Sequence, residues 1–364
     1  MDSLVHANNG RRAAAGAAVL AGALLLSGCG GGGDSSSPSK SASPAGSTPV
    51  PVEGAAGRLE AQYEQVVNDV LPSVVQIETD SGEGSGVVYD GQGNIVTNAH
   101  VVAGARRIEV TAASGGQPLK AELVGSFAAD DLAVVRASGG SLKPARFGDS
   151  GKARVGQIVL AMGNPLGLSG SVTNGIVSAL NRTVSTKREG AFPGATIGNA
   201  LQTSAAINPG NSGGALVTLN GEVIGIPTAA ASDPQMGGAA VGIGFATPSN
   251  TVKQIAPQLI RSGKVANSGR AALGVTVRTL IDPQSLQQTA VGVVEVTPNG
   301  PADKAGIKAD ELILSVNGTP TPNQTALSEV LVKLRPGDVA KVEVQGADGA
   351  KRTVDVTLGQ LPSS

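Results

Sequence analysis

The chain has 364 residues and a formal net charge of −1, with apolar residues making up 40% and charged residues 15%. This length exceeds one ordinary domain and suffices for two domains and a leader, while the near-zero charge gives no support for binding nucleic acid or another polyanion. Aromatic residues are only 2% of the chain, so the core must be built from Val, Ile, Leu and Ala.

The N-terminal segment 1–28 is predicted to be a secretory leader. Arg11 and Arg12 precede an apolar run that ends in Leu26-Ser27-Gly28-Cys29, and a basic start, a short apolar stretch and small residues mark such leaders. The run is too short and too interrupted by glycine to span a bilayer. Because Cys29 is the only cysteine, an intrachain disulfide is excluded. The segment resembles a bacterial lipobox, which implies lipidation of Cys29; a cleavable leader with an incidental cysteine is the alternative.

Residues 29–57 consist mainly of Gly, Ser, Pro and Ala. Such a composition cannot bury a core, so we expect a flexible tether.

The first folded unit, 58–263, is predicted to be mainly β. Helical spacing of apolar residues covers 58–68, and Asp90-Gly91, Gly115-Gly116 and Asn220-Gly221 supply turns between many short strands. Many short strands without alternating long helices indicate a barrel or a sandwich. The expected strands are 73–78, 85–89, 94–97, 107–111, 121–124, 132–136, 157–162, 172–179, 214–219, 223–226 and 242–247.

A helix is expected to close this unit over 249–261. Ser249 or Asn250 offers an N-cap and Gly263 a stop, while Pro257 predicts a kink or a second start.

A polar linker, 264–270, leads to a second unit of ordinary domain size at 271–361. Its predicted strands are 273–278, 291–296, 311–316, 339–344 and 352–358, and its predicted helices are 301–305 and 325–334. Mixed strands and helices make this an α+β unit.

Three scattered residues suggest acyl-transfer chemistry. Once the leader is removed, His100 is the only histidine, and Ser212 lies in Asn208-Pro209-Gly210-Asn211-Ser212-Gly213-Gly214. A serine hydroxyl needs a neighbouring base to become a nucleophile, and Asp131 offers the acid that would orient the imidazole. Taken singly, each residue also fits a structural role, as a satisfied histidine, a strand start and a loop.

The glycines around Ser212 suit the same chemistry. Consecutive amides of Gly210, Asn211 and Ser212 offer an oxyanion hole, and Gly213 and Gly214 are expected to leave room for a substrate backbone. A single histidine and no cysteine in the mature fold offer no metal-ligand cluster, so we expect neither a metal nor a cofactor.

These motifs together resemble the HtrA/Deg family of trypsin-like serine proteases with a C-terminal PDZ domain. The resemblance implies a protease of two six-stranded β-barrels and covers the chain from about Tyr63 to Leu361. It assigns the acid to Asp131, which leaves Asp130 as a solvated turn residue. The motifs are Thr97-Asn98-Ala99-His100-Val101-Val102, Asp131-Leu132-Ala133-Val134, Gly163-Asn164-Pro165-Leu166-Gly167, Val172-Thr173-Asn174-Gly175-Ile176-Val177-Ser178-Ala179 and 205–214.

The resemblance also implies which substrate side chains the protease accepts. Ala206 stands where enzymes that cut after Lys or Arg carry an acid, so with Ile226 and Thr228 it implies a pocket for small aliphatic side chains. The family commonly has Asp where Ser204 stands, and Asn or Ser where Pro227 stands. Asn211 argues against activation by N-terminal cleavage, and the family implies control by loops, with candidates at 180–199 and 229–238.

The second unit resembles a PDZ domain. Leu273, Gly274 and Val275 fit its carboxylate-binding loop, where a peptide C-terminus adds as a strand. Asn299-Gly300-Pro301-Ala302-Asp303-Lys304-Ala305-Gly306-Ile307 and Ile313-Leu314-Ser315-Val316-Asn317-Gly318 are further marks of the family. Val330 and Leu331 fit either the wall of the peptide groove or the core.

The sequence therefore predicts a lipid-anchored, extracytoplasmic serine endopeptidase that acts on unfolded or damaged proteins. The family resemblance implies a homotrimer formed through the N-terminal part of the protease, where Tyr63 is the only aromatic residue. Two alternatives remain, a chaperone-like protein with a nearly silent triad, suggested by Ser204 and Pro227, and a scaffold that acts through its PDZ domain.

Overall fold

A computed structural model describes residues 54–164, 170–208, 210–233, 238–281 and 288–361. The predicted leader, Cys29, most of the tether and Pro165-Leu166-Gly167 lie outside these residues. The described residues all belong to one compact unit. Within the described part of the chain, no helix is long and apolar enough to cross a bilayer.

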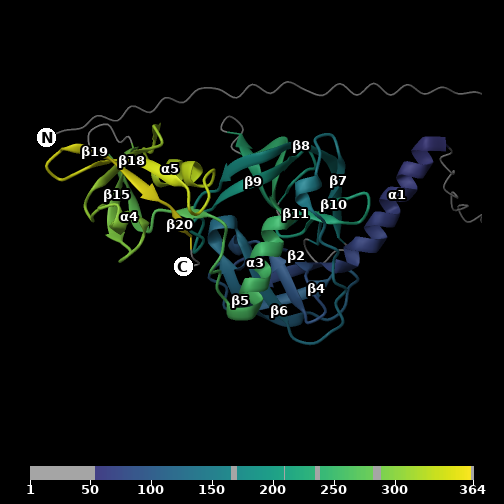
Figure 1. The fold of residues 1–364 in the computed structure, drawn as a ribbon. Coiled ribbons are helices and arrows are strands. Elements are labelled where there is room, and N and C mark those ends of the chain that lie inside the picture. The colour runs from purple at the N-terminus through teal and green to yellow at the C-terminus, as the bar shows by residue number, and fades with distance from the viewer. Residues whose placement is uncertain (1–53, 165–169, 209, 234–237, 282–287, 362–364) are drawn as a thin grey trace, which may run out of the picture. The chain divides into compact units, whose positions relative to one another are not determined.

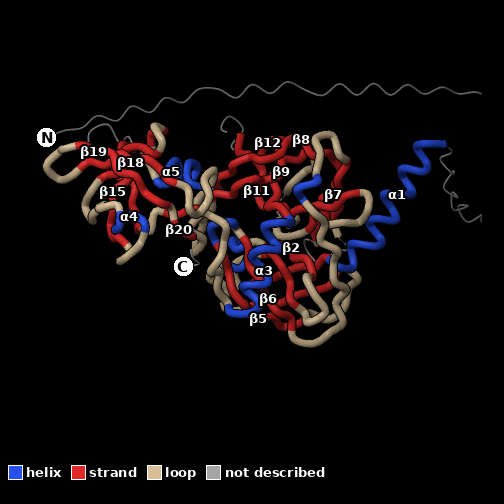
Figure 2. The backbone as a smooth tube through the Cα atoms, in the orientation of Figure 1, coloured by secondary structure: helices blue, strands red, loops and turns tan. Residues whose placement is uncertain are grey.

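Twelve strands form two closed six-stranded barrels, as the resemblance implied. Around the first barrel the order is β1-β2-β3-β6-β5-β4, and around the second it is β10-β11-β12-β9-β8-β7. Figures 1 and 2 show the two barrels, coloured by chain position and by secondary structure. The strands are β1 Val74–Thr79, β2 Glu83–Val88, β3 Asn94–Thr97, β4 Ile108–Ala112, β5 Leu119–Phe127, β6 Leu132–Ala137, β7 Ile158–Gly163, β8 Ser171–Ser185, β9 Thr196–Thr203, β10 Ala215–Thr218, β11 Val223–Asp233 and β12 Gly238–Pro248.

Alternating side chains along the strands divide the protease core. In β7, Val159 and Ala161 belong to one buried cluster of the second barrel, whereas Leu160 and Met162 belong to a cluster shared with the first barrel. Successive side chains of a strand point to opposite faces, so a strand of apolar residues can serve both clusters. The two barrels are joined by this shared layer of apolar side chains.

The helices α1 (Gly54–Val70) and α3 (Ser249–Ser262) both contribute to the shared cluster. Helix α1 begins four residues before 58, the predicted start of the folded unit. Only Val66 and Val70 of α1 are buried, and Tyr63 packs partly against the same cluster. The one aromatic ring noted in this segment therefore packs partly against the chain's own core.

Neither of the two predicted N-caps of α3, Ser249 and Asn250, is the cap. Pro248 is the cap, and Ser249 lies at the first helical position, where its hydroxyl donates to the carbonyl of Gly148 at 3.0 Å. The helix continues through Pro257 without a second start, and Gly263, with φ of 69°, ends it as predicted.

The C-terminal unit is α+β, as predicted. Strands β14, β15, β16, β18 and β19 form the main sheet in that order, β17 pairs with β16, and β13 pairs with β20. The sheet and the two helices enclose an apolar core of their own. The elements are β13 Ala271–Ala272, β14 Val275–Ile281, β15 Gln288–Val296, α4 Pro301–Lys304, β16 Leu312–Val316, β17 Thr319–Pro320, α5 Gln324–Leu331, β18 Val339–Gln345, β19 Lys351–Thr357 and β20 Gly359–Gln360.

One barrel strand was not predicted from the sequence. Strand β9 lies at Thr196–Thr203, partly inside the segment 180–199 that was expected to be a regulatory loop. Gly198 and Asn199, which has φ of 56°, interrupt its alternation. Pairing with β8 and β12 stabilises the strand, and a single sequence does not reveal such partners.

Replacing Leu259 by Ala in α3 should destabilise the protease domain. Leu259 is fully buried in the shared cluster, and removing its side chain should cost about 2–5 kcal/mol. Urea unfolding measures the loss. The exposed Leu123→Ala, at 47% relative exposure, is the matched control and should change the midpoint little; equal losses would contradict the packing.

Candidate active site

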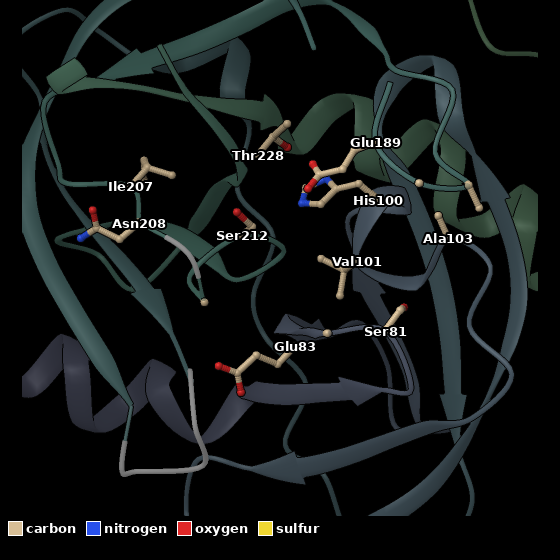
Figure 3. A pocket seen from close by; sticks show the side chains of 14 residues that line it. Ser81, Glu83, His100, Val101, Ala103, Glu189, Ile207, Asn208, Ser212 and Thr228 are labelled. Carbon is tan, nitrogen blue, oxygen red and sulfur yellow. The ribbon is translucent and has the colours of Figure 1, made fainter. Parts of the chain in front are cut away.

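A cleft of about 560 Å³ opens between segments of the two barrels. The segments 81–83 and 100–103 line it from the first barrel, and residues between 189 and 228 line it from the second. Figure 3 shows His100 and Ser212 in this cleft, with the imidazole pointing toward Ser212. Two of the three residues singled out by their chemistry therefore share one cavity.

Asp131 is buried behind His100 and fixes the orientation of its imidazole. His100 lies on the short helix α2 (Ala99–Val102), and the Oδ2 atom of Asp131 accepts a hydrogen bond from its Nδ1 at 2.7 Å. The Oδ1 atom of the same carboxylate accepts the backbone N–H of His100 at 2.9 Å. Asp131 itself adopts a left-handed backbone conformation, with φ of 51°. With Nδ1 held by the carboxylate, Nε2 is the ring nitrogen left for Ser212.

The environment raises the pKa of His100 above its ordinary value near 6.5. Burial alone would lower this pKa, but the hydrogen bond and the negative charge of Asp131 oppose burial and prevail, with help from the charge of Glu189. The imidazole is thus tuned to take up a proton.

Asn98 connects the acid to the second barrel. Its Nδ2 donates to the carbonyl of Asp131 at 2.9 Å and to the Oγ1 of Thr228 at 2.6 Å. Thr228, predicted to lie in the specificity pocket, does line the cleft. The sequence alone does not single out Asn98 as a site residue, because an amide before Ala-His carries no signal of its own.

Ser85 of β2 holds the loop that carries Ser212. Its N–H donates to the carbonyl of Ser212 at 2.9 Å, and its hydroxyl donates to the carbonyl of Gly210. The same hydroxyl accepts the N–H of Asn164 at 2.8 Å. Ser85 is fully buried, and its role could not be predicted because an isolated serine in a strand has no distinguishing neighbour in the sequence.

Gly213 and Gly214 make room for the chain itself, which corrects the expectation that they make room for substrate. A Cβ on Gly213, where φ is +82°, would lie 2.2 Å from the carbonyl oxygen of Ser85. A Cβ on Gly214 would lie 2.1 Å from the carbonyl oxygen of Met162. Both glycines allow the loop to pack closely against neighbouring backbone.

The three amides proposed for an oxyanion hole are not equivalent. The N–H of Asn211 donates to the carbonyl of Asn208 at 3.2 Å, and its side chain bonds within the same loop, to Asn208 and Ala206. The amides of Gly210 and Ser212 donate to no acceptor within the described ranges. These two are therefore the donors available to a ligand.

The remaining pocket residues lie elsewhere. Ile226 is fully buried in the shared cluster, and Ala206 is exposed with its carbonyl bonded to Thr173 and Asn211. Ile207 and Asn208, next to Ala206, line the cleft instead.

The two departures from the family pattern are accommodated locally. The hydroxyl of Ser204 accepts the N–H of Ile176 at 3.0 Å. Pro227 lies opposite Ala246 of β12, and its carbonyl accepts the N–H of Gly213 at 2.9 Å. Pro227 thus helps to hold the loop of Ser212.

A second groove, of about 370 Å³, lies in the C-terminal unit between the start of β14 and α5. Leu273, Gly274 and Val275 line it, as the resemblance implied, together with Leu331. Val330 and Leu331 both pack partly against the core of this unit, but of the two only Leu331 lines the groove.

Asp130 is not a solvated turn residue, and that expectation is wrong. It is 4% exposed, and its Oδ1 accepts a hydrogen bond from Arg270 at 2.7 Å. Arg270 lies just before β13 and also donates to the carbonyl of Ala129. A buried carboxylate needs such a partner, and Arg270 is far away in the sequence, so the pattern around Asp130 gave no indication of it.

Two closed barrels with a histidine, a buried acid and a serine at their cleft define a trypsin-like protease, here followed by a PDZ domain. The family model for a trypsin-like peptidase domain matches residues 84–226, and the PDZ model matches 271–358.

The relatives define the family more narrowly. The chain is 40% identical to the serine protease PepD of Mycobacterium tuberculosis over 88% of this chain and 71% of that protein. It is 39% identical to the serine protease Do-like HtrA of Bacillus subtilis, over 83% and 69%. A solved structure of the HtrA-type protease AlgW with a decapeptide matches with a TM-score of 0.55 and 31% identity, over 83% of this chain and 99% of AlgW. The chain therefore belongs to the HtrA family and is a serine endopeptidase.

Replacing Arg270 by Met should destabilise the protein, because Asp130 would keep a buried charge without a partner. The expected loss is about 3–5 kcal/mol. Adding Asp130→Asn should recover much of it, because a neutral amide costs less to bury. Unfolding of both single variants and the double variant measures the coupling, and strictly additive losses would refute it.

Proposed function

We propose that Ser212 is the nucleophile, His100 the general base and Asp131 the orienting acid of this protease. The observation that carries the proposal is the 2.7 Å hydrogen bond between His100 Nδ1 and the buried carboxylate of Asp131, in a cleft where the imidazole points toward Ser212 (Figure 3).

The reaction then proceeds in two halves. Ser212 Oγ attacks the peptide carbonyl while its proton passes to Nε2 of His100, and Asp131 stabilises the imidazolium. When the tetrahedral intermediate collapses, Nε2 returns the proton to the leaving amine and an ester to Ser212 remains. Water, activated by the same imidazole, hydrolyses that ester and regenerates the hydroxyl.

The oxyanion would be bound by the amides of Gly210 and Ser212. Fixed donors are effective because they need no reorganisation during the reaction. The N–H of Ser212 belongs to the same peptide unit as the carbonyl of Asn211, which accepts the N–H of Gly214 at 3.0 Å. This bond supports the role of Ser212, because a peptide unit whose carbonyl is held has an oriented N–H as well. Asn211 would contribute to the loop rather than to the hole.

The substrate class follows from the cleft and the family. Ile207 and Thr228 beside Ser212 support a preference for small aliphatic side chains before the scissile bond. We infer that the substrates are unfolded or damaged proteins and that the PDZ groove at 273–275 binds peptide C-termini. The decapeptide named with the AlgW structure supports peptide binding in this family.

We infer an extracytoplasmic location, supported by relatives named as periplasmic DegP-like endoproteases. The motif ending in Cys29 supports a lipid anchor on a tether, which would place the protease at a bacterial membrane surface. A homotrimer remains a proposal from the family resemblance. The proposed boundaries are a leader at 1–28, a tether at 29–57, the protease at 58–263, a linker at 264–270 and the PDZ domain at 271–361.

Replacing Ser212 by Ala should abolish casein digestion, with a loss of at least about 10³-fold. The wild-type protein should also react at Ser212 with a fluorophosphonate probe, and mass spectrometry of the products should show small aliphatic residues before the cuts. A folded wild-type protein that neither reacts with the probe nor cuts casein would favour the chaperone-like alternative.

The pH dependence should follow the pKa of His100. General base catalysis needs the neutral imidazole, and the pKa of His100 is raised, so the acid limb of kcat/KM should have its midpoint above about pH 6.5. The measurement is kcat/KM for peptide hydrolysis as a function of pH. A midpoint below 6.5 would contradict the dominance of Asp131 over burial.

A further inference from the structure

Two glutamates line the cleft, and neither is one of the three residues proposed to carry out the reaction. Glu189 and Glu83 are both exposed, and each lines the cavity that holds His100 and Ser212. In Figure 3 Glu189 lies by His100, whereas Glu83 lies on the other side of Val101. The reacting centre is therefore flanked by negative charge at two separate places.

The backbone holds Glu189 beside the imidazole. Glu189 and Phe192 exchange backbone hydrogen bonds of 3.0 and 2.8 Å. Phe192 is 3% exposed, and its ring meets the imidazole of His100 edge-on, with centroids 5.8 Å apart. A tight turn anchored by a buried ring thus fixes where the carboxylate of Glu189 lies.

Glu83 is fixed by the first barrel. It is the first residue of β2, paired with Glu78 of β1, and its Oε2 accepts a hydrogen bond from Gln76 at 3.2 Å. Only one residue separates it from Ser85, which holds the loop of Ser212. Its carboxylate therefore has a defined position relative to the nucleophile.

Neither carboxylate is neutralised by a neighbouring cation. Within the described ranges, no ion pair includes Glu83 or Glu189, and His100 is the only basic side chain that lines the cleft. Lys187 and Arg188 precede Glu189, but neither lines this cleft, and Arg188 lines a different cavity. A substrate that enters this cleft meets two unpaired negative charges.

We propose that Glu189 and Glu83 select substrates with Lys or Arg side chains at positions flanking the scissile bond, next to a small aliphatic residue at the bond itself. This inference rests on the proposed function of Ser212. Long cationic side chains suit such sites, because their stems can cover Val101 and Ala103 while their heads reach a carboxylate at the rim. Cationic flanks would thereby concentrate cleavage on basic stretches of unfolded chains.

The test compares two fluorogenic peptides that differ only in whether Lys or norleucine flanks the scissile bond. Wild-type kcat/KM should favour the Lys peptide by about two- to fivefold at low salt, as for exposed ion pairs, and the preference should shrink as salt rises. Glu189→Gln and Glu83→Gln should each reduce the preference, and Glu189→Lys should reverse it toward a peptide with flanking Glu.

Glu122→Gln is the matched control, because Glu122 is an exposed glutamate of β5 outside the cleft, and it should keep the wild-type preference. All rates are divided by the number of sites titrated with a fluorophosphonate. Equal rates for the two peptides with titratable Ser212 would overturn this inference and leave the proposed function intact. Absence of both titration and hydrolysis would instead overturn the proposed function.

Discussion

The site depends on one buried carboxylate. Asp131 has no exposed surface, so its charge must be met by hydrogen-bond donors or it would not be tolerated. The backbone and ring of His100 supply two donors, and Asn98 extends the contact through the carbonyl of Asp131 to Thr228 of the second barrel. The need to satisfy this carboxylate therefore orients the imidazole, and a separate hydrogen bond from Asn98 to the backbone carbonyl of the same residue connects it to the second barrel.

Asp130 is a second buried carboxylate, and a different residue compensates its charge. Two adjacent buried carboxylates would repel one another if they shared donors, but Asp131 takes up a left-handed conformation and the two residues have separate partners. Asp131 is met by His100, and Asp130 is met by Arg270, which precedes the PDZ domain. The stability of the turn that carries the proposed catalytic acid is thus linked to a residue at the junction between the two folded units.

The strands and site residues that have a strong local sequence pattern could be predicted. Apolar runs between turn residues gave most barrel strands, and the scarcity of histidine singled out His100. Strand β9 was missed because Gly198 and Asn199 interrupt it and distant strands stabilise it. Ser85 and Arg270 were missed for a related reason, since each acts on groups more than a hundred residues away. Such contacts follow from the closure of the barrels and have no counterpart in local sequence.

The groups that hold the proposed catalytic residues are buried, whereas a group proposed to set substrate preference is exposed. Ser212, His100 and Asp131 are held by groups buried in both barrels, and a change among these groups would disturb the chemistry. Glu189 instead lies on an exposed turn whose connection to the core is Phe192. A substitution at Glu189 alters the charge that a substrate meets and leaves the buried hydrogen bonds in place. Loops on a rigid scaffold are where binding preferences vary most readily. A change of charge at Glu189 would therefore act on the proposed substrate preference and, through its field, on the pKa of His100, but not on the hydrogen bonds that position the imidazole.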